Sequence, residues 1–163
     1  MGMRYSAFTG FEHIGTGSLS QVYSACTPGS TIFDRETGRV VDVDPRFPPQ
    51  EDGPRPGRPK LGVTPREVTL LPRHWDWLAT QPGGASVALR KLVEQASRDP
   101  KSRQRQLRDA AYRLATALVG NAPGYEEAMR ALYAGQGEDF AAHIEAWPAD
   151  VRKTLEEMTA EAF

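Results

Sequence analysis

The sequence predicts an α+β protein, with a small strand-and-helix unit at the N-terminus and helices over most of the remainder. Residues 5–43 contain short runs of aromatic and β-branched residues, which favour strands. From residue 73 onward, apolar side chains recur three and four residues apart, as in helices packed on a core. Between these regions, residues 45–65 hold seven of the 13 prolines, a density that prevents helix formation.

These patterns divide the chain into four expected parts. They are a small α+β unit over 1–44, a Pro-rich linker over 45–65, a strand-helix-helix segment over 66–98 and a C-terminal helical segment over 99–163.

In the first part, we expect strands at Tyr5–Thr9, Thr31–Phe33 and Arg39–Asp44. The turn Asp34–Gly38 ends in a glycine that can take a positive φ. Ser18 is expected to cap a short helix that runs through Ser24.

Six helices are expected after the linker. Their ranges are 73–81, 86–97 with Ser86 as N-cap, 102–119, 123–134, a helix spanning Phe140 to Trp147, and one after Pro148.

Composition excludes several classes of protein. The chain has 163 residues, a net charge of -1 and one cysteine. No run of 18 apolar residues exists, so a membrane-spanning helix is not expected. A single cysteine cannot form an internal disulfide or a cysteine-cluster metal site. A cytoplasmic location follows as the default expectation.

Charge is distributed unevenly along the chain. Residues 1–54 carry a net charge of -3, residues 55–113 of +8 and residues 114–163 of -6. A basic middle of this kind can bind a polyanion. Alternatively, the acidic ends fold back and neutralise it.

Residues 66–97 carry one expected strand, a helix, a turn containing Pro82-Gly83-Gly84 and a second helix. This order resembles the ribbon-helix-helix family of DNA-binding proteins. The resemblance implies a homodimer whose paired strands enter the major groove, and a phosphate bound at the helix N-terminus near Ser86. In either register, the outward face of the strand is not basic: it holds Arg66, Val68 and Leu70, or Glu67, Thr69 and Leu71. Dimerisation without DNA therefore remains open.

Two further basic segments fit DNA. Gly57-Arg58-Pro59 resembles an AT-hook, which places arginine in a narrow minor groove, although Pro56 replaces the usual basic residue and a solvated linker is the alternative. The basic run from Arg98 to Arg113 could contact phosphates or pair with the acidic C-terminal helices.

Catalysis has little support in the sequence. His13, His74 and His143 lack metal-ligand spacing, and no nearby histidine activates Cys26. We expect no catalytic residues, metal, cofactor or small-molecule substrate. Trp75 and Trp77 point to opposite sides of a helix, so one is expected in the core and the other at an interface.

A wider resemblance covers nearly the whole chain. The segments Gly57–Val63, Arg66–Trp75, Pro82–Ser86, Pro123–Ala128 and Trp147–Asp150 are similar to the signature of an uncharacterised bacterial family, a domain of unknown function. The resemblance implies a bacterial protein and supplies no activity.

Together, the patterns predict a non-enzymatic, homodimeric DNA-binding protein of the kind that regulates transcription, with no membrane partner. It would bind mainly through phosphates. The residues expected at DNA are Arg58, Lys60, Arg66, Arg73 and Ser86. The alternative is a protein-interaction or assembly module that uses the same segment only to dimerise.

Overall fold

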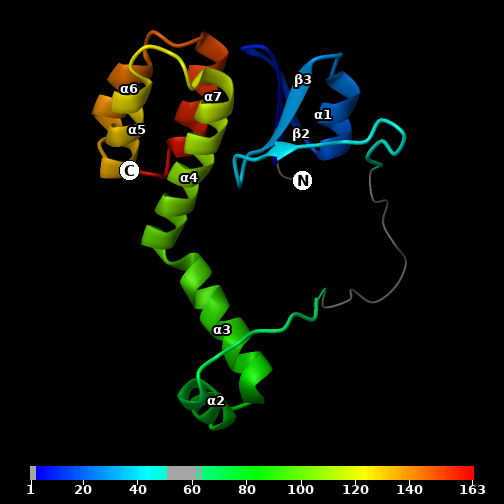
Figure 1. Ribbon diagram of the computed structural model, residues 1–163, viewed down its shortest axis with the longest axis vertical. Helices are drawn as coiled ribbons and strands as arrows, with labels where there is room; N and C mark the ends of the chain where they lie inside the picture. The colour runs from blue at the N-terminus through cyan, green and yellow to red at the C-terminus, as the bar shows by residue number, and fades with distance from the viewer. Residues whose placement is uncertain (1–2, 51–61, 63) are drawn as a thin grey trace. The chain divides into compact units, whose positions relative to one another are not determined.

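The computed structural model describes residues 3–50, 62 and 64–163 (Figure 1). Within this part of the chain it contains four strands and seven helices. Residues 3–50 and 103–163 form one compact unit, and the described residues between 62 and 102 belong to a second. The α+β class predicted from the sequence is confirmed. None of the helices in the described ranges is long and apolar enough to cross a membrane.

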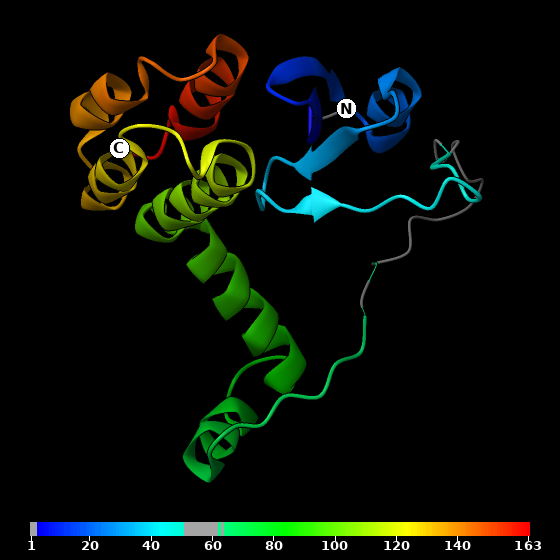
Figure 2. The ribbon, with the colours of Figure 1, turned by 45° about the horizontal axis from the view of Figure 1, so that its top comes forward.

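The first unit contains an antiparallel sheet with the strand order β2-β1-β3-β4 (Figure 2). Its strands are β1 (Tyr5–Thr9), β2 (Glu12–Gly17), β3 (Ser30–Asp34) and β4 (Val40–Val41). The predictions for β1 and β3 are confirmed, and β4 is shorter than expected. The strand β2 was not predicted, because its two glycines give it little strand propensity.

Side chains alternate between the two faces of this sheet. Ala7 and Ile32 face α1 (Leu19–Ala25), where they pack with Val22. Their neighbours Phe8 and Phe33 belong instead to the core shared with the C-terminal helices. The sheet therefore lies between α1 on one side and the helical layer on the other (Figures 1 and 2).

The short helix α1 begins as predicted. Ser18 accepts a hydrogen bond from the backbone N–H of Gln21, and the Gln21 side chain accepts one from the Ser18 N–H, which completes a capping box.

The helical layer of the first unit consists of most of α4 with the three helices that follow it. Their bounds are α4 (Pro100–Val119), α5 (Tyr125–Ala134), α6 (Gly137–Ile144) and α7 (Ala149–Thr159). Fully buried side chains from all four helices, including Leu114, Leu132, Ile144 and Leu155, form its core. The predicted C-terminal helical region is therefore confirmed, with small shifts at the helix ends.

The sheet meets α4 through small residues. Ala110, Ala111 and Ala115 are fully buried on α4, and the turn between β3 and β4 approaches the backbone of Ala110 at Gly38. Gly38 in this turn has a φ of 67°, and a Cβ atom there would overlap the carbonyl oxygen of Ala110. Glycine is therefore required at this position both by its backbone conformation and by the close approach.

The second unit contains α2 (Pro72–Ala79) and α3 (Gly84–Arg98), which form a helical hairpin. Both helices were predicted. The strand expected over Glu67–Leu71 is wrong, because residues 64–71 form neither strand nor helix. The described chain offers no adjacent strand to pair with this segment, and Leu71 instead serves as the N-cap of α2 with Pro72 as its first residue. The ribbon-helix-helix resemblance is therefore unsupported.

Replacing Gly38 with alanine should destabilise the first unit by more than about 2 kcal/mol, because the new Cβ adds a clash with the α4 backbone to the cost of a left-handed conformation. Urea denaturation followed by circular dichroism measures this.

Gly10→Ala is the matched control. Gly10 has a similar φ of 58° but no atom within 4 Å of an added Cβ, so we expect a loss of only about 1–2 kcal/mol. Equal losses for the two variants would contradict the role assigned to the Gly38 contact.

Candidate functional site

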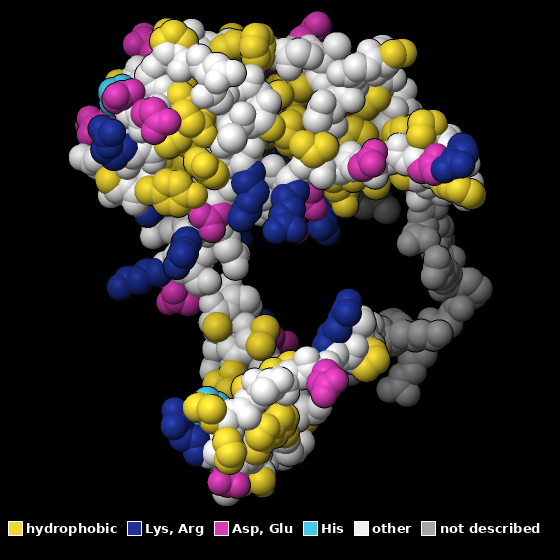
Figure 3. Space-filling view, viewed as in Figure 1, with side chains coloured by type: hydrophobic (Ala, Val, Ile, Leu, Met, Phe, Trp, Pro, Cys, Tyr) yellow, Lys and Arg dark blue, Asp and Glu magenta, His cyan; other side chains and the backbone are white. Residues whose placement is uncertain are grey.

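The α2–α3 hairpin leaves most of its apolar side chains exposed. Among the described residues of the second unit, only Leu78 and Ala88 are buried apolar residues. The exposed large apolar side chains of this unit are Val68, Leu71, Trp75, Trp77, Leu92 and Val93. Figure 3 shows hydrophobic side chains gathered over this hairpin on the face in view. Exposed apolar patches of this kind mark interaction surfaces.

A hollow of about 290 Å³, here called the hairpin groove, lies between the two helices. Its lining residues are Leu70, His74, Trp77, Leu78, Leu89 and Leu92. All but His74 contribute apolar side chains. The groove can therefore contact an apolar ligand or partner mainly through van der Waals interactions.

Local chemistry explains how the sequence forms this hairpin. At the end of α2, the Thr80 hydroxyl donates to the carbonyl oxygen of Trp77 at 2.7 Å. Gly83 follows with a φ of 84° and serves as the N-cap of α3. The Pro82-Gly83-Gly84 turn therefore returns the chain so that α3 packs against α2.

Both tryptophans of α2 are exposed, Trp75 by 43% and Trp77 by 50%. The expectation that one of them lies in a core is wrong. As expected, they point to different sides of α2. The helix α3 packs against the side that carries Leu78, which is buried, and leaves both tryptophans exposed.

The structure describes only some of the residues that were predicted to contact DNA. Arg58 and Lys60, and with them the AT-hook resemblance, lie outside the described residues. Arg66 and Arg73 are exposed. Ser86 is not the N-cap of α3, as expected, but its third residue, because Gly83 occupies the cap and the helix begins at Gly84.

The basic run on α4 is partly occupied by contacts within the first unit. Arg103 donates to Glu161 at 3.0 and 2.9 Å, and Arg108 donates to the carbonyl oxygen of Ala162 at 2.8 and 2.6 Å. Arg113 donates to the carbonyl oxygen of Thr37 at 2.8 Å. Only Arg103 pairs with an acidic side chain of the C-terminal region, as the alternative of pairing with the acidic helices expects. Arg108 and Arg113 contact backbone carbonyl groups instead.

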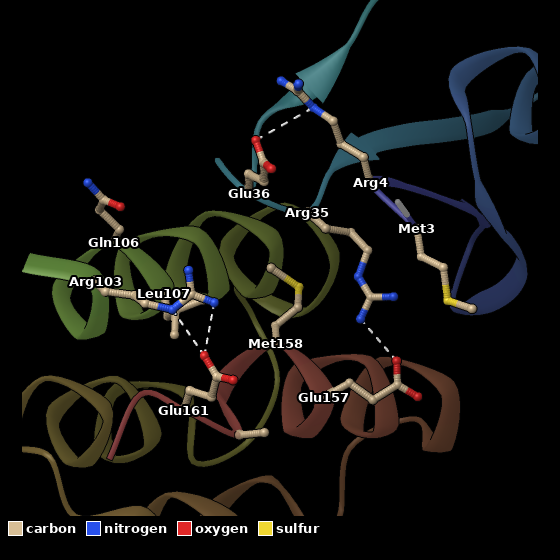
Figure 4. A pocket seen from close by; sticks show the side chains of 11 residues that line it. Met3, Arg4, Arg35, Glu36, Arg103, Gln106, Leu107, Glu157, Met158 and Glu161 are labelled. Carbon is tan, nitrogen blue, oxygen red and sulfur yellow. Dashed lines mark hydrogen bonds and ion pairs between the residues drawn. The ribbon is translucent and has the colours of Figure 1, made fainter. Parts of the chain in front are cut away.

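A second hollow, here called the charged groove, has a volume of about 570 Å³ and lies within the first unit (Figure 4). Residues near the start of β1, in the β3–β4 turn, on α4 and at the end of α7 line it. Three arginines face it, Arg4, Arg35 and Arg103, together with three glutamates, Glu36, Glu157 and Glu161. No local pattern in the sequence predicts this site, because its residues are far apart in the chain and follow no motif.

Asp34 positions the turn that carries Arg35. Its Oδ2 accepts hydrogen bonds from Nε and Nη2 of Arg4 at 3.0 and 2.8 Å. Its Oδ1 accepts from the backbone N–H groups of Glu36 and Thr37 at 2.9 and 3.1 Å. Burial raises the pKa of Asp34, but the hydrogen bonds from Arg4 and the turn outweigh burial and hold this pKa below its usual value.

The histidines and the cysteine form no catalytic arrangement in the described part of the chain. His13 Nε2 lies 2.9 Å from the Thr16 hydroxyl, and the Cys26 thiol donates to the carbonyl oxygen of Val22 at 3.2 Å. No group of three or more His, Cys, Asp or Glu side chains among the described residues could hold a metal ion.

Comparison with known proteins assigns a family. The family model described as "Uncharacterized protein conserved in bacteria (DUF2239)" matches residues 4–159. The chain belongs to this family. The match to the DUF2239 model includes the whole hairpin and most of the first unit. Of the residues that line the charged groove, Met3, Ala160 and Glu161 lie just outside it. No curated protein and no solved structure matches the chain.

Replacing Asp34 with asparagine should destabilise the first unit by about 1 kcal/mol at pH 7, because the charged hydrogen bonds from Arg4 are lost. The folded-state pKa of Asp34 is lowered, so its stabilisation is present above the unfolded pKa and disappears as the pH falls through the lower folded value. The difference between wild type and variant should therefore shrink below about pH 4.

Urea denaturation between pH 2 and pH 7 measures this difference. Asp44→Asn is the control, because Asp44 pairs with Arg46 on an exposed turn where water screens the charges. A stability difference for Asp34→Asn that does not change with pH would contradict the assignment.

Proposed function

We propose that the chain is a non-enzymatic assembly module that forms a homodimer through the α2–α3 hairpin. The observation that carries this proposal is the burial of only two apolar side chains, Leu78 and Ala88, in the described part of the second unit.

Energetic comparison supports the need for a partner. Ordering a residue costs about 1.5 kcal/mol of conformational free energy, whereas burying one large apolar side chain returns about 1.5–3 kcal/mol. A hairpin with two buried apolar side chains cannot offset the ordering of its two helices. Covering the exposed side chains of Trp77, Leu92 and Val93 would add apolar burial to the hairpin.

A second copy of the chain is a suitable partner. In a two-fold symmetric dimer, each copy uses the same surface, so every contact at the interface occurs twice. The hairpin offers both a hollow, the hairpin groove, and large side chains at or beside it, such as Trp77 and Val93. Aromatic side chains at the centre of such an interface usually contribute most of the binding energy.

DNA binding through phosphates remains the second candidate function. Five exposed cations of the second unit support it, since no ion pair joins them to any described residue: Arg66, Arg73, Arg90, Lys91 and Lys101. A homodimer would present two such sets of cations, and cations that neutralise phosphates bind more strongly at low salt. Arg103, Arg108 and Arg113 contribute less to this candidate, because they already contact other parts of the first unit.

Trp77→Glu should convert the dimer to a monomer, since it places a charge in the apolar interface at an expected cost of about 2–4 kcal/mol in association. Size-exclusion chromatography with light scattering measures the mass.

The matched control is Phe11→Glu. Phe11 is exposed by 52%, much as Trp77 is, but it lies in the first unit and should leave the dimer intact. A monomeric wild-type chain, or dimers for both variants, would overturn the proposal.

The DNA candidate predicts that a mobility shift on duplex DNA weakens steeply with salt. Arg66→Ala and Arg73→Ala should each reduce the slope of log K against log salt by about 1. Asp76→Asn on the same hairpin, which removes an acidic group, should not weaken binding. Absence of binding to any duplex at about 50 mM salt, where phosphate contacts are strongest, would exclude this candidate.

A further inference from the structure

The charged groove contains a cationic group whose hydrogen-bonding capacity is mostly unused. A guanidinium has five N–H donors. For Arg35, the structure shows one hydrogen bond from this group, between Nη2 and Oε2 of Glu157 at 3.0 Å. The Arg35 side chain is only 16% exposed. It is directed into the space between α7 and the start of β1 (Figure 4).

The unused donors of Arg35 are accessible. Among the described residues that are not exposed, no fully buried side-chain nitrogen or oxygen lacks a hydrogen-bond partner. The Arg35 nitrogens without a partner are therefore accessible, and the groove is the space that the Arg35 side chain lines. Arg103 has fewer unused donors than Arg35, because two of its nitrogens already donate to one carboxylate oxygen of Glu161.

The surroundings of Arg35 indicate the charge and shape of a ligand. Planar carboxylates form two parallel hydrogen bonds with a guanidinium. Since the three glutamates offset the three arginines that line the groove, a second negative charge on the ligand gains nothing, and a singly charged group is sufficient for Arg35. Leu107 and Met158 provide apolar surface in the same groove, which suits a ligand with an apolar body.

We propose that the charged groove binds a small organic carboxylate. Its carboxylate group lies on Arg35, and its apolar body packs against Leu107 and Met158. Glu157, which is the present partner of Arg35, competes with the ligand for the guanidinium. This site lies in the first unit and does not depend on the proposed homodimer.

Isothermal titration calorimetry of the full chain tests the proposal with phenylacetate and hexanoate as probes. Both should bind with a Kd of about 1 mM or tighter, which is reasonable for ligands of this size. Phenylacetamide and hexanamide have the same apolar bodies without the charge, and they should bind at least about tenfold more weakly. Equal binding of acids and amides, binding of neither acid, or tighter binding of inorganic phosphate would overturn the proposal.

Two variants should change carboxylate affinity in opposite directions. Arg35→Lys loses the planar donor pair and should weaken binding about tenfold. Glu157→Gln removes the competing carboxylate and should strengthen binding about threefold or more. A purely structural ion pair would make both variants bind less or leave both unchanged, and either result would contradict the proposal.

Glu156→Gln is the matched control for these variants. Glu156 is the neighbouring residue on α7, where it pairs with Arg152 at 3.8 Å, and it is not part of the groove. Carboxylate affinity should be unchanged in this variant. Circular dichroism verifies that each variant is folded, so a loss of binding by unfolding is distinguished from the loss of the Arg35 donors.

Discussion

Burial of apolar side chains differs sharply between the two units of this chain. In the first unit, Phe8 and Phe33 of the sheet pack with the core of the C-terminal helices. In the second, the described α2–α3 hairpin buries only Leu78 and Ala88. Apolar burial is the main favourable term in folding. The first unit has an extensive apolar core of its own, whereas the hairpin buries little apolar surface by itself. The proposed homodimer would supply the surface that the hairpin lacks.

Contact between the sheet and α4 also determines the geometry of the charged groove. Gly38 approaches the backbone of Ala110 more closely than any other residue type allows, and Asp34 holds the same turn through hydrogen bonds to the Glu36 and Thr37 N–H groups. The turn places Arg35 opposite Glu157 of α7, 122 residues later in the chain. Rigid backbone contacts therefore fix a mostly buried guanidinium beside an open hollow, as a preorganised binding site requires.

Local patterns in the sequence predicted most of the elements. The apolar spacing of the six later helices, the Ser18 cap and the Asp34–Gly38 turn are all found, because each depends on residues close together in the chain. The strand over Glu67–Leu71 was wrong, since a strand depends on a neighbour that the sequence pattern does not reveal. The strand β2 was missed for the related reason that pairing with β1, and not propensity, forms it. The charged groove could not be predicted, as it depends on how the β3–β4 turn packs against α4 and α7.

Hydrogen exchange at several protein concentrations tests the central claim most directly, because it follows the hairpin and the first unit in the same molecule. If dimerisation stabilises the hairpin, the α2 and α3 amides should exchange faster as the chain is diluted about 100-fold. The loss of protection cannot exceed the loss of dimer that mass action predicts for this dilution. Protection of the β1, β3 and α7 amides should not change. Hairpin protection that is independent of concentration would show that α2 and α3 are stable without a second copy, and would contradict the account.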